Sequence, residues 1–342
     1  MGIIAHETWS MDVNQPVLAT DNLSVGYHQR RGQSRSVLQN LNLSLAKGEF
    51  VCLLGANGAG KSTLIRTLTH MQAPISGSVT INQQPLHHLS KAQLAKQLSV
   101  VLTDRLQVSN LTGYELVSLG RMPYTNLFGS LNQHDHQVVR WALHATNSDD
   151  LAQRLLNEMS DGERQRIMIA RALAQEPAVM ILDEPTAFLD LPRRVEITSL
   201  LRKLAHETGL SVVMSTHDLD LAIGSADRLW LVFDDGSIEC GTPEDLILDG
   251  RLAQTFRKSQ LQFDQQRGGF RAQTQPIGQV RLSANGLHGQ WMQHALERAG
   301  YHVLNAKQAD CPHIQQLEND CWQVEHQPCA NIDQVLAYLG NI

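Results

Sequence analysis

The sequence predicts an α/β fold with a buried, partly parallel sheet, followed by a small α+β domain. Short apolar runs alternate with helix-favouring stretches over most of the chain, which is typical of α/β architecture. Between Ser259 and Gln279 the chain becomes rich in glutamine, and its 342 residues exceed one average domain. We therefore predict a larger domain over residues 17–257 and an accessory domain over residues 258–342.

The clearest strands of the larger domain are apolar runs that end in polar or glycine-rich residues. In chain order they are FVCLLG (50–55), LSVVL (98–102), AVMILD (178–183) and LSVVMST (210–216). Helix-favouring sequence follows each of them. Because ligands of open α/β sheets bind outside the carboxyl ends of the strands, we expect the functional loops at that edge.

The accessory domain contains two predicted strands and two predicted helices. They are the strand and turn QVRLSANG (279–286), the helix LHGQWMQHALERAG (287–300), the strand YHVLNA (301–306) and the helix NIDQVLAYL (331–339). One face of the last helix is apolar and carries Ile332, Val335, Leu336 and Leu339. Four potential metal ligands in this domain fit no zinc spacing, so we interpret them as structural or incidental: Cys311, His313, Cys321 and Cys329.

Composition and charge exclude several classes of function. No window approaches the roughly 18 consecutive apolar residues of a membrane helix, and the first residues lack the basic start and apolar stretch of a secretory signal. Five cysteines form no CxxC pair, which favours reduced thiols and a cytoplasmic location. A net charge of -6 without a basic cluster disfavours binding to nucleic acid.

A phosphate-binding loop is predicted by GANGAGKST, which matches G-x-x-x-x-G-K-[ST] between a strand and a helical stretch. Its glycines let backbone N–H groups face phosphates, Lys61 reaches the β and γ phosphates, and the hydroxyl of Ser62 binds Mg²⁺. The expected ligand is a nucleoside triphosphate with Mg²⁺. The loop comprises Gly55, Ala56, Asn57, Gly58, Ala59, Gly60, Lys61, Ser62 and Thr63.

Two further strands end in residues suited to hydrolysis. Asp183 and Glu184 end one strand, where Asp183 would hold the metal through water and Glu184 would polarise the attacking water. We expect this acidic strand to be a neighbour of the phosphate-loop strand. His217 follows the next strand along the chain and could hydrogen-bond the γ phosphate and orient the water. Glu184, His217 and Lys61 are thus the predicted catalytic residues.

Four motifs together resemble the nucleotide-binding subunits of ATP-binding cassette (ABC) transporters, over about residues 17–257. In order they are GANGAGKST, MSDGERQR, MILDEPTAFLD and STHD. The resemblance implies a P-loop NTPase cassette with a RecA-like core, an antiparallel β subdomain and a helical signature subdomain. It also implies an ATPase whose two copies pair head to tail, with each ATP between the P-loop of one copy and the signature helix of the other.

The same resemblance assigns further residues. Tyr27 matches the aromatic residue that stacks on adenine, and Ser160 and Gly162 match signature positions that contact ATP in the partner copy. Residues 187–190 match the loop that crosses the dimer interface.

The chain departs from the family pattern LSGGQ at Asp161, which replaces a glycine. Two interpretations remain open. The carboxylate can cap the helix, which is locally favourable. Alternatively, this helix start still receives a phosphate, with Asp161 turned aside, Ser160 and the backbone of Gly162 in contact, and ATP-driven closure weakened.

A second departure is Asp104, which stands where the family has a glutamine that senses magnesium and the membrane partner. An aspartate can accept a metal-bound water, so the predicted metal ligands are Ser62, Asp183 and Asp104. Gln107 is the alternative to Asp104 at this loop.

The segment 111–135 contains ELVSLGRMPY and LFG, and resembles the coupling region of importers for iron siderophores, haem and cobalamin. The implied partners are a pair of membrane permease subunits and, indirectly, a substrate-binding protein, which would place the chain at the inner face of the membrane.

The accessory domain is expected to regulate the dimer or help hold it. Two alternatives are a non-transport cassette ATPase and a low-turnover, nucleotide-dependent interaction module.

Overall fold

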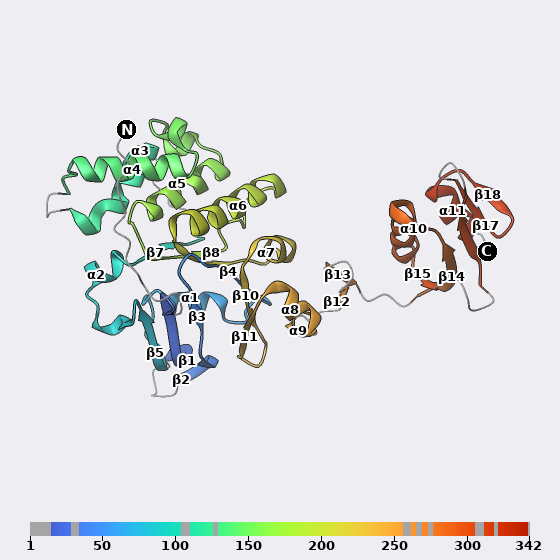
Figure 1. The fold of residues 1–342 in the computed structure, drawn as a ribbon, viewed down its shortest axis with the longest axis horizontal. Helices are drawn as coiled ribbons and strands as arrows, with labels where there is room; N and C mark the ends of the chain where they lie inside the picture. Colours follow the sequence, from blue (N-terminus) through green and yellow to red (C-terminus); the bar gives the residue numbers. More distant parts are fainter. Residues whose placement is uncertain are drawn as a thin grey trace. The chain divides into compact units, whose positions relative to one another are not determined.

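The computed structural model describes residues 15–28, 34–103, 110–125, 129–255, 261–264, 269–272, 276–304, 311–317 and 321–340. Contacts divide the chain into two compact units, Met1–Phe270 and Arg271–Ile342 (Figure 1). No helix within the described ranges is long and apolar enough to cross a membrane.

A six-stranded sheet forms the middle of the first unit, in the order β11-β10-β4-β9-β8-β7. All neighbouring pairs are parallel except β10 with β11. The strands are β4 Phe50–Gly55, β7 Leu98–Val101, β8 Val179–Asp183, β9 Ser211–Ser215, β10 Arg228–Val232 and β11 Ile238–Gly241. The four predicted strands and their parallel pairing are therefore confirmed. The expected direct pairing of the acidic strand with the phosphate-loop strand is wrong, because β9 lies between β8 and β4.

Both faces of this sheet are covered, which explains the uninterrupted apolar runs of its strands. Side chains of β4 alternate between two cores: Phe50 and Cys52 pack into one cluster, and Val51 and Leu53 into the other. Figure 1 shows the helices α3 to α6 over the first face, and α1 with an antiparallel sheet over the second. The remaining helices of the core are α1 Lys61–Leu68, α6 Leu191–Thr208, α7 Leu219–Ser225, α8 Pro243–Leu248 and α9 Arg251–Thr255.

The antiparallel and helical parts implied by the resemblance are both present. The first is a sheet with the order β2-β1-β5-β6, and with β3 paired to β1. Its elements are β1 Leu18–His28, β2 Ser34–Leu41, β3 Ser44–Leu45, β5 Ser76–Ile81, β6 Gln84–Pro85, η1 Leu86–His88 and α2 Lys91–Ala95. The helical part comprises α3 Gly113–Ser118, η2 Leu119–Tyr124, α4 Gln133–Ala145, η3 Asp149–Leu151, η4 Leu156–Glu158 and α5 Asp161–Leu173.

The segment predicted as a connector contains two paired strands, β12 Leu261–Asp264 and β13 Gly269–Ala272. Phe263 of β12 packs into the core of the first unit, and the division between the units falls after Phe270. The division between the units therefore lies further along the chain than the predicted domain boundary, which was placed between residues 257 and 258.

The second unit is a five-stranded sheet in the order β15-β14-β16-β17-β18 with two helices. The predicted strands and helices correspond to β14 Gly278–Ser283, α10 Gly286–Arg298, β15 Tyr301–Leu304 and α11 Ile332–Leu339. The predicted apolar face of α11 packs into the core of this unit. Three short strands were not predicted: β16 His313–Gln316, β17 Trp322–Val324 and β18 Gln327–Cys329.

Candidate functional site

The predicted phosphate loop connects β4 to α1 and has the backbone that its glycines permit. Gly58 and Gly60 have φ angles of 79° and 108°, a region that side chains disfavour. A Cβ atom on Gly60 would also lie 2.6 Å from Cγ1 of Val37. Among the described residues, no side chain caps the start of α1. Its first backbone N–H groups are therefore available to an anionic ligand.

Lys61 and its neighbours complete this loop. The Nζ atom of Lys61 donates to the carbonyl oxygens of Gly55 at 2.8 Å and Ala56 at 3.2 Å. Burial lowers the pKa of Lys61, and the carboxylates of Glu184 and Asp183 oppose that shift. The lysine thus lies within electrostatic reach of both predicted acidic residues.

Tyr27 of β1 lies beside the start of α1. Its hydroxyl is 3.0 Å from Oγ1 of Thr63, and 49% of the residue is exposed. An exposed aromatic ring tethered next to a phosphate loop could stack on a base. Ser62 is also exposed, which leaves its hydroxyl accessible.

Asp183, Glu184 and His217 meet at the carboxyl edge of the parallel strands. Glu184 directly follows β8, and its Oε2 atom lies 3.7 Å from Nδ1 of His217. Glu184 has a φ angle of 46°, an uncommon backbone region for a residue other than glycine. The pairing of β8 with β9 brings His217 to the two acidic residues, which are neighbours in the sequence.

Two hydroxyl groups that the sequence analysis did not single out contact Asp183. Ser215, at the end of β9, donates to Oδ1 of Asp183 at 2.7 Å. Thr103, just after β7, donates to the backbone oxygen of Asp183 at 2.6 Å. The sequence signal that could have identified these two residues is their position at the carboxyl end of an apolar strand. Asp104 and Gln107, the predicted loop ligands that follow Thr103, lie outside the described residues.

The signature helix α5 is capped by Ser160 and not by Asp161. The hydroxyl of Ser160 accepts from N–H of Glu163 at 3.3 Å, and the Glu163 side chain reaches back to N–H of Ser160 at 2.8 Å. Asp161 is the first helical residue, and its carboxylate lies 3.4 Å from a guanidinium nitrogen of Arg164. The interpretation of Asp161 as the cap is therefore wrong.

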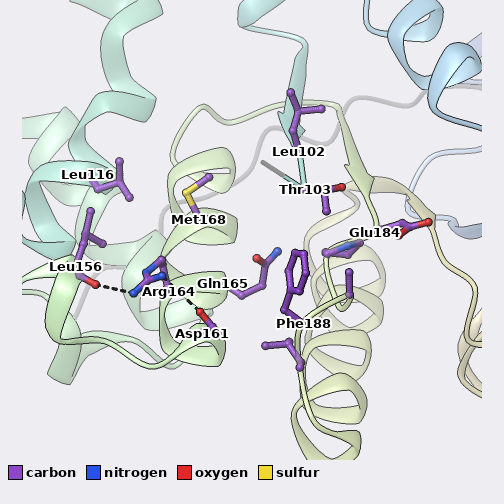
Figure 2. A pocket seen from close by; sticks show the side chains of 13 residues that line it. Leu102, Thr103, Leu116, Leu156, Asp161, Arg164, Gln165, Met168, Glu184 and Phe188 are labelled. Atoms are coloured by element: carbon purple, nitrogen blue, oxygen red, sulfur yellow. Dashed lines mark hydrogen bonds and ion pairs between the residues drawn. The ribbon is translucent and has the colours of Figure 1, made fainter. Parts of the chain in front are cut away.

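A pocket separates α5 from the loop that follows β8 (Figure 2). Asp161 and Arg164 line it from the side of α5, whereas Thr103 and Glu184 lie on the opposite side. Phe188, in the loop predicted to cross the dimer interface, also lines the pocket and is 62% exposed. Asp190 ends that loop and caps α6 by accepting from N–H of Arg193 at 3.1 Å.

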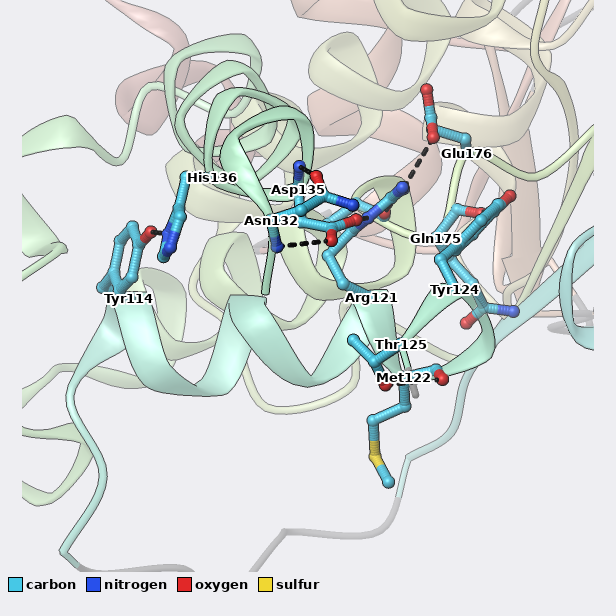
Figure 3. Close-up of polar contacts among 11 residues, drawn as sticks. Tyr114, Arg121, Met122, Tyr124, Thr125, Asn132, Asp135, His136, Gln175 and Glu176 are labelled. Atoms are coloured by element: carbon cyan, nitrogen blue, oxygen red, sulfur yellow. Dashed lines mark hydrogen bonds and ion pairs between the residues drawn. The ribbon is translucent and has the colours of Figure 1, made fainter. Parts of the chain in front are cut away.

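The predicted coupling segment is held to the rest of the helical part by Arg121, which is buried (Figure 3). Its guanidinium binds Asp135 at 2.9 Å, Glu176 at 2.6 Å and the carbonyl oxygen of Ala174 at 2.8 Å. The ring of Tyr124 lies 4.0 Å from the guanidinium carbon. Met122 points away from this network and is 67% exposed.

The potential ligands of the second unit do not gather into a metal site. The Nε2 atom of His313 pairs with Oγ of Ser283 at 2.7 Å, and Cys329 is buried. In the parts of the chain that the structure describes, no three His, Cys, Asp or Glu side chains are placed to hold a metal ion.

The fold and the phosphate loop define a P-loop nucleotide-binding protein. Residues 38–187 match the family description "ABC transporter", and residues 277–340 match "Iron ABC transporter C-terminal domain". An ABC transporter ATP-binding protein of Methanocaldococcus jannaschii is 42% identical over 266 residues, which cover 78% of this chain and 90% of that protein. The chain belongs to the ATP-binding proteins of ABC transporters, and it is an ATPase.

Other relatives carry more specific names. The achromobactin transport ATP-binding protein CbrD of Dickeya dadantii is 37% identical, over 70% of this chain and 86% of that protein. The iron(3+)-hydroxamate import ATP-binding protein FhuC of Bacillus subtilis is 35% identical, over 70% and 87%.

Solved structures that share the fold include two ABC transporter proteins. A transporter assigned to the metal-chelate type, in an inward-facing conformation, matches with a TM-score of 0.61 and 30% identity, over 71% of this chain and 90% of that chain. A dimeric ABC transporter cassette matches with a TM-score of 0.57 and 28% identity, over 66% and 98%.

Proposed function

We propose that this chain energises the import of an iron complex, a ferric siderophore in the first place, by hydrolysing ATP at the site between α1 and the carboxyl end of β8. The observation that carries the ATPase proposal is that Lys61, Glu184 and His217 lie at the carboxyl ends of three neighbouring parallel strands, β4, β8 and β9. The names of the relatives and the match of residues 277–340 support an iron complex as the cargo. Haem and cobalamin are the other cargoes of the importers that the sequence resembles.

The site suits Mg²⁺ held mainly by ATP. Ser62 is exposed at the start of α1, and Asp183 ends β8, so one hydroxyl and one carboxylate are offered. This sparse donor set fits Mg²⁺, which keeps several waters and binds one or two carboxylates plus substrate phosphates. When bound, the ion would neutralise charge on the β and γ phosphates. Asp104 would be a third ligand of this ion.

The chain's own residues then serve hydrolysis. Backbone N–H groups at the start of α1 and the ammonium of Lys61 bind the phosphates, and Tyr27 stacks on the adenine. Glu184 polarises a water for attack, and His217 orients that water and the γ phosphate. Because Glu184 and His217 face each other, one water can contact both side chains.

A head-to-tail dimer would complete each site with Ser160 and Gly162 of the second copy. The dimeric cassette among the structural relatives supports a dimer. Arg164 draws the carboxylate of Asp161 along α5, so the negative charge is partly neutralised before a phosphate docks. The loop 187–190, with its exposed Phe188, would cross the interface.

The exposed surface near Met122 would contact a pair of permease subunits at the inner face of the membrane, and a substrate-binding protein would act through that permease. Residues 258–342 would regulate the dimer or help to hold it. Neither role requires contact with the cargo.

Uptake by a deletion strain tests the function. The strain should regain uptake of radiolabelled ferric siderophore when it carries the native chain. It should show no uptake when it carries the Glu184→Gln variant. Labelled haem and cobalamin distinguish the alternative cargoes. Uptake of all three without the chain would contradict a role in import.

A further inference from the structure

The peptide bond between Asp183 and Glu184 is held from both sides by hydroxyl groups. The hydroxyl of Ser215 accepts from N–H of Glu184 at 2.9 Å, while that of Thr103 donates to the carbonyl oxygen of Asp183 at 2.6 Å. The two hydroxyls come from the ends of β9 and β7, the strands that flank β8. Both polar atoms of one peptide unit are thus bound by side chains from neighbouring strands.

Ser215 also fixes the carboxylate of Asp183. Its hydroxyl proton goes to Oδ1 of Asp183 at 2.7 Å, which leaves its lone pairs for N–H of Glu184. Ser215 is fully buried, so water does not compete for either hydrogen bond. One hydroxyl therefore orients a side chain of the predicted metal site and the backbone of the predicted base.

The backbone of Glu184 needs such support. Its φ angle of 46° is uncommon for a residue with a side chain, and conformations of this kind persist only where the surroundings hold them. Rotation of the preceding peptide plane would change the direction of the Glu184 side chain, which now lies 3.7 Å from His217. The two hydroxyls prevent that rotation.

We propose that Ser215 and Thr103 are positioning residues for ATP hydrolysis, which hold the Asp183–Glu184 peptide so that the Glu184 carboxylate stays directed at His217. This inference rests on the proposed roles of Glu184 and Asp183. Ser215 has the additional task of orienting the Asp183 carboxylate toward the metal, whereas the hydroxyl of Thr103 donates to the Asp183 backbone.

Steady-state hydrolysis by the purified full chain, at varied ATP and Mg²⁺, tests the proposal. Ser215→Ala and Thr103→Val remove one hydroxyl each, and each should lower kcat by about tenfold or more with little change in KM for ATP. Only Ser215→Ala should raise the Mg²⁺ concentration that gives half the maximal rate. Thr103→Ser keeps the hydroxyl and should restore most of the rate.

The matched control is Ser211→Ala. Ser211 lies at the other end of β9, is also fully buried, and accepts from N–H of Gly48 at 3.2 Å. It should retain the native kcat and Mg²⁺ dependence. An equal fall in kcat for Ser211→Ala and Ser215→Ala would mean a general effect on β9 and would overturn the role of Ser215.

Glu184→Gln distinguishes a failure of the proposed role of Glu184 from a failure of the positioning role of Ser215 and Thr103. If it hydrolyses ATP like the native chain, the proposed role of Glu184 fails and this inference with it. If it is inactive while Ser215→Ala and Thr103→Val keep the native kcat, only the positioning role is overturned. Thr103 is only partly buried, so Thr103→Val decides the question even if Ser215→Ala does not fold.

Discussion

The Nδ1 atom of His217 lies 3.7 Å from Oε2 of Glu184. The two side chains are 50% and 30% exposed, so a water and a phosphate can reach both from solvent. Each follows the carboxyl end of a different parallel strand, β9 or β8, and those strands are neighbours. This pairing is the geometric basis for the first prediction.

Replacement of Glu184 by glutamine should stop hydrolysis without preventing ATP binding. The amide keeps the size of the side chain but cannot accept a proton, and the loss of such a group costs about 10²–10⁴-fold in rate. Light scattering should then show a dimer that forms only with ATP. The control is Glu207→Gln, a 64% exposed carboxylate on α6 that should hydrolyse ATP normally. Turnover by Glu184→Gln at the native rate would rule out the proposed base.

Replacement of Asp161 by glycine should strengthen ATP-driven dimerisation. The carboxylate competes with a phosphate for the start of α5, and its pairing with Arg164 at 3.4 Å is partly exposed. A pair of this kind contributes only about 0.2–1 kcal/mol, so the stability of the chain should change little. The ATP concentration at which half of the protein is dimeric should fall. It is measured in the Glu184→Gln background.

Asp161→Asn and Asp149→Asn make a matched pair of charge changes for that measurement. Asp149 is exposed and pairs with His144, away from α5. Asp161→Asn should shift dimerisation in the same direction as the glycine, and Asp149→Asn should not. Unchanged dimerisation in both Asp161 variants would contradict a cost of the carboxylate at this helix start.

Replacement of Arg121 by methionine should destabilise the first unit by about 3–5 kcal/mol, because it leaves Asp135 as a buried charge without its partner. Urea unfolding followed by circular dichroism measures this change. Arg140, exposed on the same helix as Asp135, supplies the control: Arg140→Met should stay within about 0.5 kcal/mol of the native chain. Equal stability of the two variants would show that the buried pair contributes nothing.

Acid should weaken the first unit through Asp135. Burial alone would raise the pKa of Asp135, but hydrogen bonds from N–H of Asn132 and from Arg121 outweigh it and hold the pKa below its ordinary value. Stability from this carboxylate is therefore complete above the unfolded pKa of about 3.9 and is lost as the pH falls through the lower folded pKa. The free energy of unfolding should depend less on pH below about 4 in Asp135→Asn than in the native chain. The same slope in both proteins would contradict this account.

A cavity in the second unit should lower the stability of that unit alone, because the two units have separate cores. Leu296 of α10 is fully buried, so Leu296→Ala should cost about 2–5 kcal/mol. Calorimetry should show one transition moved to lower temperature while the cassette transition stays in place. Leu287, 65% exposed on the same helix, provides the control variant Leu287→Ala. A single transition that moves as a whole would mean that the units unfold together.

Features with local signals could be predicted from the amino-acid sequence alone. The phosphate loop is one contiguous motif, and its conformation follows from glycines at the two positions with positive φ. Four of the five parallel strands of the core were predictable, because strands buried on both faces must be apolar throughout. The position of Asp183, Glu184 and His217 at the carboxyl edge of the sheet was predictable, because each ends or follows such a strand.

The order of these strands in the sheet, and the partners of their polar residues, became known only from the folded chain. Nothing along the chain shows that β9 separates β8 from β4, because strand order depends on pairings between distant segments. A serine at the end of an apolar run and a threonine after another are unremarkable until the sheet brings Ser215 and Thr103 to one peptide. From the sequence, an arginine such as Arg121 would be expected on the surface. The structure shows that it is buried and bound to Asp135 of α4 and to Ala174 at the end of α5.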